Sequence, residues 1–397
     1  MRTTFVFLFS ILSIILLTVN CRERTVKNQP VSYSADTAVM ILYIGTYTEN
    51  ETRDAGKSTG VYIYSMNRIT GELSYIGASP VTTNPSYIDI HPSGKWIYTV
   101  NETGKPGGSP GTISAFRLTD NGKALEFLNA VSSEGDYPCF VQVDRTGKYA
   151  MTANYGSGTV ALLPIKADGS LGNAVSVDHH SGKGHSARQE SAHAHMIICS
   201  NDNRFAYSCD LGTDIIYIYR LDTVQGKLLP AENNYHTQPG AGPRHLTFHP
   251  FKNLAYVVNE LNGTIECMQA DTLNGTLSRF QVVSTVSDGK GQEAACADIH
   301  VSPDGNYLYA SNRGKYNNIA MYSVDALTGE LTLTGHQEVK GKTPRNFIIE
   351  PAGNYMLVAN QNSDNVVTFR IDPETGKLID IGSEIKIPSP VCLKFLK

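Results

Sequence analysis

Short apolar segments interrupted by polar residues recur along the chain, and turn-forming residues separate them. Examples are GVYIYSMN (60–67), DIIYIYRLD (214–222) and NVVTFRID (365–372), which are rich in β-branched and aromatic residues. Such residues favour strands, and the NG, DG and TG pairs between segments supply the positive φ that tight hairpin turns require. No long helical period appears after the first twenty residues. The pattern predicts an all-β chain of short antiparallel strands.

Two motifs repeat along the chain, 47 to 57 residues apart. The first ends an apolar strand and spans 42–47, 91–102, 144–155, 200–211, 249–260, 302–313 and 350–361. The second places a Leu shortly after a turn glycine, at Gly71, Gly122, Gly169, Gly226, Gly275, Gly329 and Gly376. Two independent series with seven members each indicate seven repeats. Four short strands in about fifty residues is typical of a propeller blade.

The first repeat lacks its innermost strand, and the end of the chain supplies a match. Six innermost strands are expected at 85–90, 138–143, 194–199, 243–248, 296–301 and 344–349, and PVCLKF (390–395) is a seventh copy. This strand would pair into the first blade and remove the exposed edge. The sequence therefore predicts a seven-bladed β-propeller over residues 39–397, with four strands per blade. A closed ring needs no partner for stability, so we expect a monomer.

Because the repeats are equivalent, residues at one register position form a ring around the propeller axis. The second position of the innermost strand reads Ser86, Cys139, His195, Arg244, Ala297, Arg345 and Val391. The end of the next strand reads Thr46, Asn101, Asn154, Asp210, Asn259, Asn312 and Asn360, and Asn there commonly bonds local backbone. The following residue reads Tyr47, Glu102, Tyr155, Leu211, Glu260, Arg313 and Gln361. The first and third rings follow no common rule, which points to a role outside the repeat.

Both variable rings are expected to open at the same end of the propeller, because one strand of a hairpin starts where its neighbour ends. This places the candidate catalytic residues on three consecutive blades: His195, Arg244, Glu260 and Arg313. The candidate substrate-binding residues of the same rings are Glu102, Tyr155 and Arg345. A structural alternative is open for both groups. A Glu260–Arg313 salt bridge would explain that pair, and a salt bridge in the channel would explain Arg345.

Charge and the first residues limit the partners and the location. The formal net charge of −4, with no Lys/Arg stripe, excludes a nucleic-acid binder. Residues 5–19 form an apolar run behind Arg2, too short for a membrane-spanning helix, which predicts an export signal over 1–20. Cleavage before Cys21 would resemble a lipoprotein signal, with 21–38 as a polar tether, although Thr18-Val19-Asn20 departs from the usual pattern. We expect a periplasmic or lipid-anchored protein.

Metal and cofactor chemistry is not expected. Six further cysteines contain no CxxC pair and mostly lie in apolar strand patterns, so buried thiols are expected and a disulfide is left open. A metal is one interpretation of the histidines between Asp178 and His195. The Gly- and Ser-rich stretch 178–192 instead favours a loop over the mouth. The sequence also contains no serine nucleophile elbow and no phosphate-binding glycine loop before a helix.

The motifs GPRHLTFHP, AYVVNEL, ADIHVSPDGNYLYASNRG and RQESAHAHMI carry a family resemblance. Over residues 40–397 the chain resembles the bacterial propeller-type 6-phosphogluconolactonases, a family that also includes fungal carboxy-muconate cyclases. The resemblance implies a seven-bladed propeller that acts on lactones without a metal. It also implies a functional His, two Arg and a Glu, which match His195, Arg244, Arg313 and Glu260. His193, in the same AHAH motif, is assigned a supporting, substrate-binding role.

The residue types suit lactone hydrolysis. An imidazole is the natural general base near neutral pH, which is the role expected of His195. Arg244 and Arg313 are expected to bind anions, and Glu260 to act as an acid or to orient an Arg. The expected reaction converts 6-phospho-D-glucono-1,5-lactone to 6-phosphogluconate. Export of the chain raises the alternative of an unphosphorylated lactone, and a non-catalytic binding scaffold is the second alternative.

Overall fold

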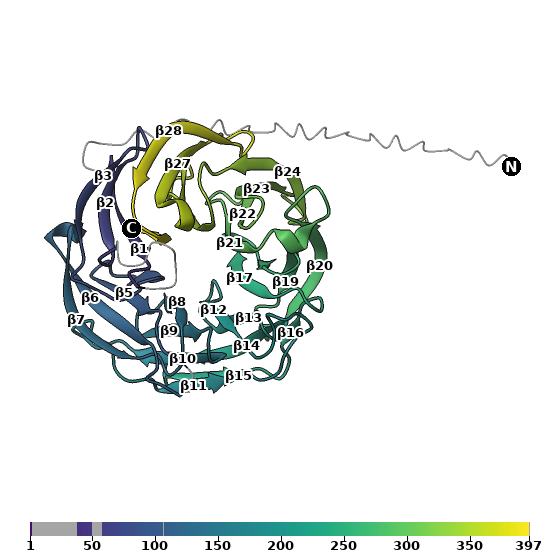
Figure 1. The fold of residues 1–397 in the computed structure, drawn as a ribbon. Helices are drawn as coiled ribbons and strands as arrows, with labels where there is room; N and C mark the ends of the chain where they lie inside the picture. Colours follow the sequence, from purple (N-terminus) through teal and green to yellow (C-terminus); the bar gives the residue numbers. More distant parts are fainter. Residues whose placement is uncertain (2–37, 50–57, 106, 397) are drawn as a thin grey trace. The chain divides into compact units, whose positions relative to one another are not determined.

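The structure is a computed structural model that describes residue 1 and residues 38–49, 58–105 and 107–396. Within these residues the chain forms seven antiparallel sheets arranged as blades around a central axis (Figure 1). Six sheets have four strands, and the fourth blade has a fifth. The predicted seven-bladed β-propeller is confirmed.

Each blade is a sheet whose strands follow one another from the axis outwards. Blade 1 contains β29 (Pro390–Phe395), β1 (Val39–Thr46), β2 (Tyr62–Asn67) and β3 (Leu73–Ala78). Blade 2 contains β4 (Ile88–Ile90), β5 (Trp96–Asn101), β6 (Thr112–Thr119) and β7 (Ala124–Ser132). Blade 3 contains β8 (Pro138–Val143), β9 (Tyr149–Asn154), β10 (Thr159–Pro164) and β11 (Ser176–His179). Blade 4 contains β12 (Ala194–Cys199), β13 (Phe205–Asp210), β14 (Ile215–Asp222) and β15 (Lys227–Pro230), with β16 (Tyr235–His236) also on β14.

The remaining blades are regular. Blade 5 contains β17 (Pro243–Phe248), β18 (Leu254–Asn259), β19 (Thr264–Ala270) and β20 (Leu277–Ser284). Blade 6 contains β21 (Cys296–Val301), β22 (Tyr307–Asn312), β23 (Asn318–Val324) and β24 (Leu331–Glu338). Blade 7 contains β25 (Pro344–Ile349), β26 (Tyr355–Asn360), β27 (Asn365–Ile371) and β28 (Leu378–Lys386). The described residues also contain the short 3₁₀ turns η2 (Asp120–Gly122), η3 (Gly291–Glu293) and η4 (Gln361–Ser363).

The ring is closed by the pairing of β29 with β1. Leu42 lies opposite Phe395 and Ile44 opposite Leu393 in an antiparallel register, as the sequence predicts. Figure 1 shows the C-terminal strand beside β1 on the inner side of the first blade. The pairing covers the inner edge of β1 that would otherwise be open to another chain.

The blades pack face to face through apolar side chains, and the turn glycines allow close contact. Every residue of β18 is buried, because that strand is covered by the blades on both sides. Gly169 has φ 88°, and a Cβ there would lie 2.1 Å from Nε1 of Trp96 on the preceding blade. Only glycine fits such a position, which explains one member of the repeated glycine series.

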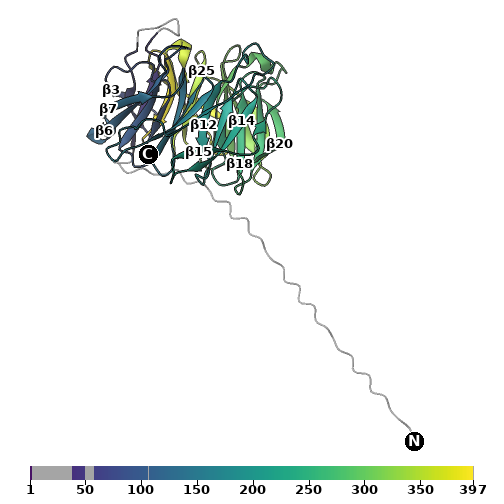
Figure 2. The ribbon, with the colours of Figure 1, turned by 90° about the horizontal axis from the view of Figure 1, so that it is seen from below.

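The ring of Asn residues has the structural role expected from the sequence. The side-chain amides donate to carbonyl oxygens of the preceding connection: Asn101 to Thr83, Asn154 to Ser133, Asn312 to Thr285 and Asn360 to Val339. Seen from the side, the strands run between the two ends of the ring (Figure 2). In these four blades the amide bonds tie the end of the second strand to the loop that leads into the same blade.

Candidate active site

The variable position of the innermost strand is a β-bulge. In blade 4 the pairing register shifts between Ala194 and Met196, which leaves His195 without a partner in the ladder. The same shift surrounds Arg244 in blade 5 and Arg345 in blade 7. A bulge disrupts pairing locally and re-aims the bulged side chain, and such bulges are common beside active sites. The repeat therefore places no pairing constraint on the residues that carry the candidate chemistry.

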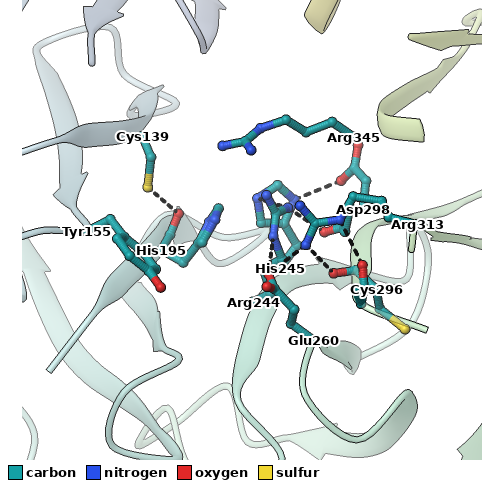
Figure 3. A network of polar contacts seen from close by, with 12 residues as sticks. Cys139, Tyr155, His195, Arg244, His245, Glu260, Cys296, Asp298, Arg313 and Arg345 are labelled. Atoms are coloured by element: carbon teal, nitrogen blue, oxygen red, sulfur yellow. Dashed lines mark hydrogen bonds and ion pairs between the residues drawn. The ribbon is translucent and has the colours of Figure 1, made fainter. Parts of the chain in front are cut away.

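A cavity of about 310 Å³ lies where the two variable rings meet. Its lining residues are Tyr47, Glu102, Tyr137, Cys139, Tyr155, Arg188, His195, Arg244, Glu260, Arg313 and Arg345. The expectation that both rings open at one end is confirmed. Figure 3 shows the side chains of His195, Arg244, Arg313 and Arg345 converging from different blades.

Glu260 is the centre of the ionic network in the cavity wall. Its carboxylate accepts hydrogen bonds from Arg188 Nη1 at 2.6 Å and Arg244 Nε at 2.9 Å, and Arg313 Nη2 lies 2.9 Å away. Burial alone would raise the pKa of Glu260, but Arg313, Arg244 and Arg188 lower it to about 2. The carboxyl group has no proton to donate at neutral pH. Of the two expected roles, orienting the arginines is therefore the one that this geometry supports.

Arg244 and Arg313 are held by backbone as well as by Glu260. Arg244 Nη1 donates to the carbonyl oxygen of Ala297 at 2.6 Å. Arg313 Nε donates to the carbonyl oxygen of Ala295 at 2.7 Å. Among the described residues, Nη2 of Arg244 and Nη1 of Arg313 have no hydrogen-bond partner. Both guanidinium groups thus keep N–H donors available for an anion or a polarised carbonyl oxygen.

His195 is a neutral imidazole within this positive surrounding. The residue is 5 % exposed, and within the described chain its buried Nδ1 has no hydrogen-bond partner. Burial, followed by the charges of Arg244, His245, Arg345 and Arg313, holds the pKa of His195 well below its usual range. The unprotonated ring can accept a proton from water, which is the first requirement of a general base.

Arg345 has donors that no described residue engages. Its guanidinium lies 5.3 Å from the ring centre of Tyr47, and its Nη2 is 3.9 Å from Glu102 Oε1, beyond hydrogen-bond distance. Glu102 instead accepts from the hydroxyls of Tyr47, at 2.8 Å, and Ser86. The channel salt bridge considered as an alternative for Arg345 is therefore only a long contact with Glu102. The guanidinium is positioned to receive an anion from the cavity.

Tyr155 lines the cavity, whereas His193 does not. The His193 ring stacks on Tyr155 with 4.5 Å between ring centres, and its Nδ1 bonds the backbone carbonyl of Tyr155 at 2.9 Å. The supporting role expected of His193 is thus placed behind the cavity wall. Direct contact with a substrate is expected of Tyr155 and not of His193.

Sequence reasoning missed Arg188, which comes from the connection between β11 and β12. Besides Glu260, Arg188 reaches the hydroxyl of Tyr155 through Nη2 at 3.0 Å. The expectation that residues 178–192 form a loop at the mouth is confirmed for this part, although β11 extends to His179. Arg188 opens the motif RQESAHAHMI, and that motif was its one signal in the sequence.

His180 of this loop and the cysteines are structural. His180 is buried and bonds Asp210 at 2.7 Å and Tyr219 at 2.9 Å. Within the described residues no group of three His, Cys, Asp or Glu side chains is arranged to hold a metal ion. All six cysteines from Cys139 to Cys392 are free and buried, so no disulfide joins them. The export signal, the tether and Cys21 lie outside the described residues, and no helix in the described part is long and apolar enough to cross a membrane.

Acid is expected to destabilise the fold through the buried side chains of His245 and Glu260. Burial and Arg244 lower the pKa of His245 from 6.5 to about 4, although Asp298 opposes the shift. The unfolded chain therefore binds a proton first, and this stability is full above pH 6.5 and lost as pH falls to about 4. The loss is about 3 kcal/mol for His245 alone. The carboxyl of Glu260 adds a further loss between about pH 4.5 and 2. Urea unfolding at pH 7, 5.5 and 4.5 measures the effect, and a constant unfolding free energy would contradict it.

Comparison with known proteins agrees with the fold. The family model described as "Lactonase, 7-bladed beta-propeller" matches residues 41–395. A 6-phosphogluconolactonase of Bacillus subtilis is 33% identical over 90% of this chain and 98% of its own. A solved structure from Bacteroides fragilis has a TM-score of 0.84 at 34% identity, covering 92% of this chain and 100% of its own. The periplasmic gluconolactonase of Pseudomonas aeruginosa has a TM-score of 0.83 at 30% identity, covering 90% and 99%. This chain belongs to the seven-bladed β-propeller lactonase family.

Proposed function

We propose that the protein hydrolyses a sugar lactone that carries an anionic group, with 6-phospho-D-glucono-1,5-lactone as the substrate. The observation that carries this proposal is the charge of the cavity. Four arginines face two carboxylates around a neutral imidazole, so the cavity has a net positive charge. At about 310 Å³ it also lies within the size range of small-molecule sites. The activity named for the Bacillus subtilis relative supports the same substrate.

The residues supply the steps of ester hydrolysis in order. His195 accepts a proton from water while the water oxygen bonds to the lactone carbonyl carbon. Donors of Arg244 and Arg313 stabilise the negative charge that develops on the carbonyl oxygen. When the ring C–O bond breaks, protonated His195 returns the proton to the departing ring oxygen, leaving a hydroxy acid. Glu260 stays ionised throughout and orients the arginines.

Arg345 is the proposed site for the anionic group of the substrate. It faces the cavity from the seventh blade and lacks a hydrogen-bond partner among the described residues. A bound phosphate offsets part of the positive charge near His195, and the basicity of His195 then rises. Substrate binding would in this way strengthen the base that activates the attacking water.

Replacing Arg345 by Gln is expected to lower kcat/KM for the phosphorylated lactone by about 10- to 100-fold. Activity on unphosphorylated gluconolactone should change less than about twofold, because that substrate has no group for Arg345. Both rates are measured with and without a chelator after subtraction of the spontaneous opening. The matched control is Arg370→Gln, an exposed arginine on the same blade. Equal losses on both lactones would contradict the assignment of Arg345.

The same measurement tests the alternatives. A wild-type protein that hydrolyses gluconolactone as well as its phosphate would favour an unphosphorylated substrate. The periplasmic location of the Pseudomonas aeruginosa relative supports that alternative for an exported chain. Tight binding of lactones without hydrolysis would favour the binding scaffold.

We also propose that the full chain is exported and tethered by a lipid on Cys21. The apolar run behind Arg2 and the periplasmic relative support export. Fractionation of cells that carry the full chain, compared with Cys21→Ser, distinguishes a tethered from a free periplasmic protein. Recovery of both forms from the cytoplasm would overturn the proposal.

A further inference from the structure

A polar layer lies directly beneath the arginines, one position further along the innermost strands. This position reads Tyr87, Phe140, Met196, His245, Asp298, Asn346 and Cys392. It is aromatic, a thioether or a thiol in four blades, whereas His, Asp and Asn occupy it in the three consecutive blades that carry Arg244, Arg313 and Arg345. The repeat does not require polar groups here, and burying them without hydrogen bonds is unfavourable. Their presence in these blades calls for a separate explanation.

Asp298 is the anchor of this layer. It is 1 % exposed, and Oδ1 lies 2.8 Å from His245 Nδ1. Its other oxygen accepts from Asn346 Nδ2 at 2.5 Å and contacts His300 Nε2 at 3.1 Å. The interaction with His300 and the hydrogen bonds from His245 and His300 outweigh burial and hold the pKa of Asp298 well below its usual range. The carboxylate is ionised and can only accept.

The Asp298 carboxylate, an acceptor that faces Nδ1, decides which nitrogen of His245 carries the proton. Neutral imidazole has one N–H, and Asp298 requires it at Nδ1. Nε2 is then an acceptor, and it lies 3.3 Å from Arg244 Nη1 (Figure 3). If the proton were on Nε2, two donors would face each other at this contact. The ionised Asp298 therefore acts on Arg244 through His245.

The contacts of Arg244 show what this arrangement achieves. Nε is engaged by Glu260, and Nη1 by the Ala297 carbonyl and by His245. The guanidinium is thus held at two of its three nitrogens, and Nη2 is left for the cavity. Arg244 is only 2 % exposed, so water offers little alternative support.

We propose that Asp298 and His245 are positioning residues that hold Arg244 with one nitrogen presented to the substrate. The inference rests on the proposed function for its kinetic consequence, but the protonation pattern does not depend on activity. Neither residue lines the main cavity. Their effect is expected on the transition state, where the position of the guanidinium matters most.

Two substitutions test the pair. His245→Phe removes both contacts and should still fold, because Phe140 occupies the equivalent position in blade 3. Asp298→Asn keeps the shape but can donate to Nδ1, which moves the proton of His245 to Nε2. Both variants should lower kcat by about 10- to 100-fold while KM changes less than about threefold. The control His249→Phe removes a buried histidine that does not line the cavity and should leave kcat unchanged. Thermal melting checks that each variant is folded.

A spectroscopic measurement separates this proposal from the proposed function. In protein labelled with ¹⁵N-histidine, the signals lost in His245→Phe identify His245. We expect a protonated Nδ1 and an unprotonated Nε2 at pH 7, and the reverse in Asp298→Asn. A proton on Nε2 in the wild type would overturn the proposal even if lactones are hydrolysed. So would folded variants of either residue with wild-type kcat on a lactone that the protein hydrolyses. The expected ¹⁵N pattern with no hydrolysis of any lactone would instead overturn the proposed function alone.

Discussion

Replacing Glu260 by Gln is expected to lower kcat for lactone hydrolysis by about 100- to 1000-fold. The amide keeps the shape of the side chain but removes the charge that Arg188, Arg244 and Arg313 share. Without it the guanidinium groups repel one another, and the donors aimed at the carbonyl oxygen move apart. KM for a phosphorylated lactone should stay the same or fall, because the cavity becomes more positive.

The same substitution should lower the free energy of unfolding by about 3–5 kcal/mol, since it leaves buried cations without their partner. Steady-state kinetics and urea unfolding measure the two effects. Glu266→Gln is the matched control. Glu266 is a fully buried carboxylate of the same blade that pairs with Arg279 at 3.3 Å, away from the cavity. It should lose stability and keep kcat. A Glu260→Gln variant with kcat within tenfold of wild type would show that the carboxylate does not organise the site.

Replacing His195 by Ala is expected to lower kcat by about a thousandfold, which is typical for the loss of a general base. The control is His193→Asn, whose residue lies behind Tyr155 and should change kcat by less than about fivefold. Stability of the His195→Ala variant at neutral pH should be close to wild type, because the Nδ1 that is removed makes no hydrogen bond within the described residues.

The pH profile gives a second test of His195. Activity requires the neutral ring, so it falls as pH drops through the pKa of His195, which lies well below that of an ordinary histidine. In kcat, which reports the substrate complex, this acid limb should lie at higher pH than in kcat/KM, because bound phosphate offsets the arginines. An acid limb that persists unchanged in His195→Ala would assign the base to another group.

The register of the repeats made much of the site predictable. Because the seven blades act as an internal alignment, His195, Arg244, Glu260 and Arg313 could be grouped before any coordinates. The β-bulges could not be foreseen, because no residue type or local sequence pattern distinguishes the bulged positions from the paired positions beside them. The expected strand at 85–90 likewise begins only at Ile88, because Asn84 has a positive φ and Pro85 follows it.

The other features that sequence reasoning missed or left open lie outside the repeated strands or depend on distances between charged groups. Arg188 belongs to the connection between β11 and β12, outside the strand positions that the repeat aligns, so no register position marks it. The short β16 in blade 4 was missed for the same reason. The role of Glu260 depended on distances to three guanidinium groups, and a sequence does not contain those distances. The sequence left two roles open for Glu260, a proton donor and a residue that orients the arginines. The ion pairs favour the second role.

The closure of the ring by β29 also sets the order in which the site can form during synthesis. Tyr47 follows β1, the first strand made, whereas Arg345 and the closing strand are made last. At about 5–20 residues per second, a ribosome separates these events by tens of seconds. Throughout that interval the inner edge of β1 has no partner. The cavity is therefore complete only when the last strand has joined the first, and an unfinished chain has no means of binding its substrate early.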